Sequence, residues 1–89
     1  MDDFFTPFDL ETALQIEQLA RLVFETRTAR GQVLARYQVE DEAALLREIE
    51  TGRVEEHPAY EHYLGACILQ ETYLNARETM AALTQKANQ

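Results

Sequence analysis

The stretch that decides the fold is residues 60–83, YEHYLGACILQETYLNARETMAAL. Its apolar residues recur at steps of three and four, which places them in stripes along an α-helix. One stripe consists of Tyr60, Leu64, Cys67, Glu71, Leu74, Glu78 and Ala81, and the other of His62, Ala66, Leu69, Tyr73, Ala76, Met80 and Leu83. The stripes lie about 150° apart at 100° per residue, so this helix is apolar on two sides.

A third stripe runs through residues 13–37 and is interrupted by arginines, where the first stripe of 60–83 is interrupted by glutamates. Its members are Ala13, Ile16, Ala20, Val23, Arg27, Arg30, Leu34 and Tyr37. Opposite charges in two such stripes predict helices that pack against each other.

The charged stripe positions predict a structural ion pair. If the two helices are antiparallel with Tyr37 near Tyr60, Arg27 comes level with Glu71. We therefore expect a partly buried pair that fixes register more than it adds stability. The full set of candidates is Arg27, Arg30, Glu71 and Glu78. The alternative is that the helix rotates here and that both charges are solvated.

Capping and breaking residues divide the chain into helices over 7–37, 41–51 and 58–84, within a single domain of residues 1–89. Thr6 and Pro7 suit a helix start, Gly52 suits a stop, and Pro58 opens the last helix, after which residues 85–89 are expected to fray. The sequence leaves open whether the first helix kinks near Gly31. The predicted fold is all-α, an antiparallel hairpin of two long helices with a short connecting helix.

The two-sided helix predicts self-association. The helix over 7–37 covers one side and the short helix covers only part of the other, which leaves a large apolar stripe exposed. We expect a homodimer that forms a four-helix bundle through His62, Ala66, Leu69, Tyr73, Ala76, Met80 and Leu83. The alternative is that the first helix bends at Gly31 and wraps both sides.

Charge and composition limit the partners. The 89 residues include 16 acidic and 8 basic side chains, a net charge of −8 that disfavours nucleic acids and anionic membranes. Four arginines, Arg21, Arg27, Arg30 and Arg36, form a local basic stripe and leave a weaker nucleic-acid hypothesis. One cysteine and no long apolar run predict a cytoplasmic protein.

The densest polar cluster contains both histidines, and it is the only candidate for chemistry. His57 and Glu61 are four apart, while His62 points about 100° away from Glu61. No glutamate lies three residues before either histidine, so the di-iron pattern of helical bundles is absent. His62 is expected at a subunit contact, bonded to a carboxylate or a tyrosine hydroxyl.

No catalytic or cofactor motif is present, so the sequence predicts neither an enzyme nor a cofactor. The leading hypothesis is a small acidic helical-bundle protein that acts through protein–protein interaction, as a regulator, adaptor or assembly accessory factor. Its acidic surface suits a basic protein surface. The alternative hypothesis is a bundle that binds a metal or small ligand through His57, Glu61 and His62.

Overall fold

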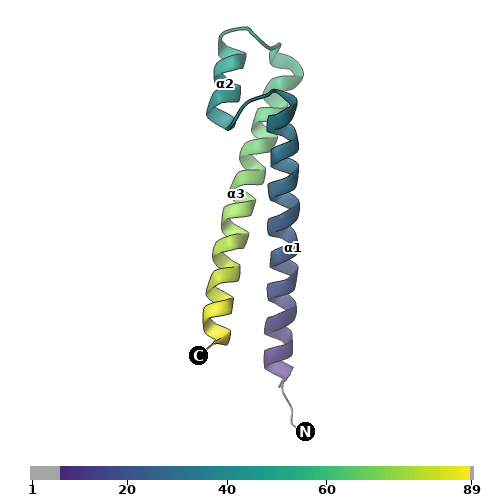
Figure 1. Cartoon of the computed structure of the whole chain (residues 1–89), viewed down its shortest axis with the longest axis vertical. Helices are drawn as coiled ribbons and strands as arrows, with labels where there is room; N and C mark the ends of the chain where they lie inside the picture. The colour runs from purple at the N-terminus through teal and green to yellow at the C-terminus, as the bar shows by residue number, and fades with distance from the viewer. Residues whose placement is uncertain (1–6, 89) are drawn as a thin grey trace.

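Three helices make up the computed structural model, which describes residues 7–88 (Figure 1): α1 is Pro7–Arg36, α2 is Glu42–Glu50 and α3 is Glu56–Ala87. The long helices α1 and α3 lie side by side and antiparallel, and α2 lies beside the N-terminal part of α3. The molecule measures 65 × 17 × 16 Å. The predicted all-α hairpin with a short connecting helix is confirmed.

Helix α1 is continuous through Gly31, which settles the question of a kink there. It ends where Gln38 takes a left-handed conformation, with φ of 56°. The backbone amides of Tyr37 and Gln38 then bond to carbonyls of the last helical turn, at 3.1 Å each. The proposed cap Thr6 lies outside the described residues.

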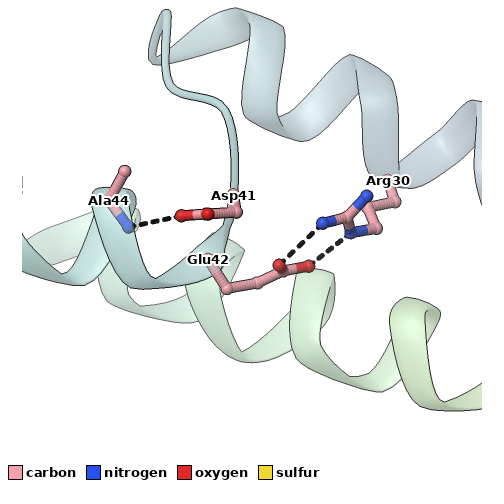
Figure 2. Close-up of polar contacts among 4 residues, drawn as sticks. All are labelled: Arg30, Asp41, Glu42 and Ala44. Carbon is pink, nitrogen blue, oxygen red and sulfur yellow. Dashed lines mark hydrogen bonds and ion pairs between the residues drawn. The ribbon is translucent and has the colours of Figure 1, made fainter.

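Helix α2 has the capping expected of a short helix. The carboxylate of Asp41 accepts a hydrogen bond from the amide of Ala44 at 2.8 Å (Figure 2). This bond satisfies one of the amides that a helix start leaves without a partner. Gly52 has φ of 80°, a conformation that favours glycine, and it turns the chain toward α3.

Helix α3 begins as expected but extends further than predicted. His57 has non-helical angles, φ −106° and ψ 122°, so regular helix starts at Pro58. At the other end, α3 continues to Ala87, beyond the predicted bound of residue 84, and the fraying of residues 85–89 stays a prediction. They contain no helix-breaking residue, and the amide of Asn88 bonds back to the carbonyl of Thr84 at 3.2 Å.

The core within the described residues is thin. Its buried apolar residues are Leu34, Leu45, Ala59, Ala66 and Ala76, and Thr12 and Thr26 are also buried. Thr26 satisfies its hydroxyl by donating to the carbonyl of Leu22 at 2.8 Å. Only two buried residues are larger than alanine or threonine, so the hairpin gains little hydrophobic stabilisation from its own core.

The stripe that we expected at a dimer interface lies partly against α1 within the chain. Ala66 is fully buried, Ala76 is 4% exposed, and His62 bonds to Tyr37, the residue that follows α1. His62, Leu69 and Leu83 of the same stripe line grooves at the surface, and the dimer interface stays a prediction. The other stripe faces outward, with Leu64 at 43% and Leu74 at 49% exposure.

The arginine-bearing stripe of α1 packs in part as predicted. Ile16, Val23 and Leu34 are buried or half-buried, whereas Arg27 is exposed. Because Glu71 lies on the outward side of α3, the predicted pair of Arg27 with Glu71 does not form, and neither Glu71 nor Glu78 has an ion pair among the described residues. Keeping two carboxylates in water avoids their desolvation cost.

Replacing Leu45 tests the importance of α2 for this thin core. Leu45 is fully buried, so Leu45→Ala should lower the free energy of unfolding by about 2 to 4 kcal/mol. Urea titration at a fixed protein concentration measures the loss. Leu46→Ala is the control, because Leu46 is only half-buried and should lose less than about 1.5 kcal/mol. Equal losses would contradict the packing of α2 through Leu45.

Candidate functional site

A two-point ion pair fastens α2 to α1 (Figure 2). The guanidinium of Arg30 donates from Nε to Oε2 of Glu42 at 2.5 Å and from Nη2 to Oε1 at 2.9 Å. The two side chains are only 24% and 16% exposed. Bidentate geometry fixes the orientation of both groups, so this pair sets the position of the first turn of α2.

The pair shifts the titration of both groups. The hydrogen bond to Arg30 lowers the pKa of Glu42 below its ordinary value of 4.5, and the hydrogen bond to Glu42 raises the pKa of Arg30. A lowered carboxyl pKa stabilises the fold at pH values above 4.5, and this contribution is lost as the pH falls through the folded-state pKa.

A second polar contact joins α3 to the residue that directly follows α1, near the α2 end of the hairpin. The hydroxyl of Tyr37 and Nδ1 of His62 share a hydrogen bond of 2.5 Å, and the two rings are 5.7 Å apart. The expected tyrosine hydroxyl partner of His62 is confirmed, but the bond lies within one chain rather than between subunits.

The candidate metal residues do not converge. Nδ1 of the exposed His57 donates to Oε2 of Glu61 at 2.8 Å, whereas His62 is turned toward Tyr37, which follows α1. The pKa of Glu61 is lowered, first by its own backbone amide and then by His57. Within residues 7–88, no group of three or more histidine, cysteine, aspartate or glutamate side chains is arranged to hold a metal ion.

The main surface feature is the outer face of α3, which we define by Tyr60, Leu64, Ile68, Glu71, Leu74 and Glu78. Its four apolar members are between 42% and 62% exposed. Two shallow grooves adjoin it: one of about 340 Å³ runs between Glu42 of α2 and Leu74, and one of about 380 Å³ lies between Leu74 and Ala81. The face combines apolar contact area with carboxylates that have no basic partner among the described residues.

A second surface lies along the seam between α1 and α3, and we call it the groove face. One groove of about 560 Å³ is lined by Gln15, Gln18, Leu19, Leu22, Thr79 and Leu83. Another of about 290 Å³ is lined by Ala29, Gln32, Val33, Arg36, His62 and Leu69. No residue of α2 lines either groove, so α2 leaves this surface open.

Cys67 fits a structural role. It is half-buried on α3 and forms no disulfide. Hydrogen bonding to Cys67 raises the pKa of Tyr63 one turn earlier. The partner of the thiol in this contact is therefore a tyrosine of the same helix, not a histidine that could activate it.

Sequence reasoning missed Glu42 as the partner of Arg30. Within residues 40–42, Asp41 caps the start of α2, while Glu42 turns back to α1. An arginine in an otherwise apolar stripe, followed twelve residues later by a carboxylate at a helix start, was the available signal. The basic stripe is thereby reduced, because Arg30 is neutralised while Arg21, Arg27 and Arg36 are exposed.

Comparison with known proteins identifies a family. The family model described as "Uncharacterized protein MJ0235 family" matches residues 11–88, which include most of α1 and all of α2 and α3. No curated protein and no solved structure matches the chain. In the part of the chain that the structure describes, no helix has both the length and the apolar composition to cross a bilayer.

The ion pair of Arg30 with Glu42 predicts a pH-dependent stability. At pH 7, Glu42→Gln should lower the free energy of unfolding by about 1 to 2 kcal/mol, and the difference from wild type should shrink as the pH falls below 4.5. Denaturant titrations between pH 7 and pH 3 measure it. Glu48→Gln is the control, since Glu48 faces a largely exposed Arg53 at 3.6 Å and should cost less than about 0.5 kcal/mol. A Glu42→Gln deficit that is the same at every pH would contradict the account.

Proposed function

The chain belongs to the MJ0235 family, and we propose that it acts by binding other proteins, as a small homodimeric helical bundle with no catalysis of its own. A regulator, an adaptor and an assembly accessory factor all work in this way. The polar contacts described above join residues of the chain to one another. The proposal therefore rests on the surface of the hairpin.

The observation that carries the proposal is the large exposed area of a chain whose buried core is small. The chain exposes 6614 Å², whereas a compact monomer of 10.3 kDa exposes about 5400 Å². The exposed large apolar residues among those described are Leu10, Leu14, Leu22, Phe24, Tyr60, Leu64, Ile68 and Leu74. The excess of about 1200 Å² is comparable with the roughly 800 Å² that each partner buries in a standard interface.

The outer face of α3 favours a basic partner. Glu71 and Glu78 are exposed there beside Leu74, and the chain as a whole carries a net charge of −8. A partner helix with apolar residues at helical spacing and lysine or arginine opposite these carboxylates would match both features. Complementary charge would also speed association at low salt.

A metal- or ligand-binding function has no supporting observation of its own. His57 and Glu61 bond to each other on the surface, and His62 bonds to Tyr37. The proposed function is therefore association with other protein chains alone.

Self-association predicts a solution mass of two chains. Sedimentation equilibrium should give twice 10.3 kDa, because the thin core leaves a single hairpin marginal. The melting temperature should also rise with protein concentration, since dissociation and unfolding are linked. A mass of one chain, together with a melting temperature that is constant over a hundredfold concentration range, would contradict a homodimer.

The partner surface predicts which variants lose binding. A protein captured from native lysate by the tagged chain should bind the purified chain more weakly as salt rises. It should also bind at least about tenfold more weakly to Leu74→Glu, which places a charge in the apolar contact. Leu14→Glu on α1 serves as the control, since Leu14 has a similar exposure, about 50%, and lies off α3. Equal binding to both variants would rule out the outer face of α3.

A further inference from the structure

The groove face has the spacing of a helix-packing surface on both long helices. On α1, steps of four, three, seven, four and three join Gln15, Leu19, Leu22, Ala29, Val33 and Arg36, and the lining residues Gln18 and Gln32 directly precede Leu19 and Val33. On α3, those from His62 to Leu83 follow steps of seven, ten and four. Every step is a sum of threes and fours in heptad order, so each set forms one stripe on its helix.

The two grooves therefore lie on one side of the hairpin. Leu22 of the larger groove and Ala29 of the smaller one are seven residues apart on α1, and Leu69 and Leu83 are fourteen apart on α3. Residues at these spacings share a helix face. The stripe on α1 spans 21 steps, or about 32 Å, so two helices of about 10 Å diameter present roughly 640 Å² of flat surface. That area approaches the roughly 800 Å² that one partner buries in a standard interface.

The distribution of carboxylates indicates which molecule binds the groove face. No carboxylate lines either groove, although the chain has 16 acidic residues. The grooves at the outer face of α3, in contrast, are lined by Glu42, Glu71 and Glu78. Two copies with a net charge of −8 each repel one another, so they associate most favourably through a surface that brings no carboxylates together. A basic partner would find no carboxylate in the lining of either groove.

We propose that the groove face joins two copies of this chain side by side, so that α1 and α3 of both copies form a two-fold four-helix bundle. This inference rests on the homodimer proposed above and assigns its interface. Leu19, Leu22, Leu69 and Leu83 then enter a shared core, and the alanine and threonine positions between them let the helices approach closely. The outer face of α3 stays free for the basic partner.

Two pairs of variants test the assignment, each pair separated by two residues and so by about 200° around its helix. On α1, Leu22→Glu adds a charge in the groove, and Phe24→Glu adds the same charge at a residue that is more exposed and lines neither groove. On α3, Thr79→Arg lies in the groove, and Ala81→Arg lies beside the outer face. All four residues are exposed in the single chain, so their new side chains are solvated there.

Sedimentation equilibrium over a concentration series, with circular dichroism for helix content, gives the readout. Leu22→Glu and Thr79→Arg should weaken self-association by at least about tenfold, whereas Phe24→Glu and Ala81→Arg should leave it within about twofold. Any helicity that the groove variants lose at low concentration should return at high concentration.

Each other outcome has a distinct meaning. Loss of association in Phe24→Glu or Ala81→Arg, with Leu22→Glu and Thr79→Arg unaffected, would overturn the groove face and leave the homodimer standing. Association that none of the four variants weakens would overturn the groove face as well. A wild-type chain with the mass of a monomer at every concentration would remove the homodimer itself.

Discussion

Two long helices packed against each other cannot enclose a core, and the rest of this structure depends on that constraint. Each helix of a pair buries one stripe against its neighbour and leaves its remaining sides to solvent. Here the buried positions of α3 are Ala59, Ala66 and Ala76, which bring the helices close but bury little apolar area. A helix that is apolar on two sides then needs a second covering layer, which the nine-residue α2 supplies over only part of its length.

Charge divides the surface into regions suited to different partners. Glu42 lies against α1, where it is neutralised by Arg30 and holds α2 in place. Glu71 and Glu78 lie on the outer face of α3, where water solvates them and a basic helix would find them. No carboxylate lines either groove of the groove face. An acidic chain arranged in this way can meet a copy of itself on one side and a basic protein on another without like charges in contact.

The elements of the fold were predictable because their signals are local. Heptad spacing marked both long helices, Pro58 marked the start of α3, and Asp41 and Gly52 marked the two ends of α2. The orientation of α3 was not predicted, because its two stripes are similarly apolar and only tertiary packing chooses between them. The physical criterion was nevertheless present in the sequence: the stripe with Glu71 and Glu78 costs more to desolvate than the stripe without carboxylates. Arg30 pairs with Glu42 because the chain turns at Gln38, and no sequence pattern indicated this turn. The site was accordingly predicted only in part: His62, Leu69 and Leu83 of the expected stripe line the groove face, but the exposure of Leu64 and Leu74 on the other stripe was not predicted.

Small-angle X-ray scattering of the full chain tests the central claim most directly, because it reports mass and shape together. A single hairpin is 65 Å long and has a radius of gyration of 18.2 Å over its Cα atoms. Two copies that complete each other's core side by side should scatter with the mass of two chains and a longest dimension that stays near 65 Å. A particle with the mass of one chain, or one with the mass of two chains and nearly twice this length, would contradict the account.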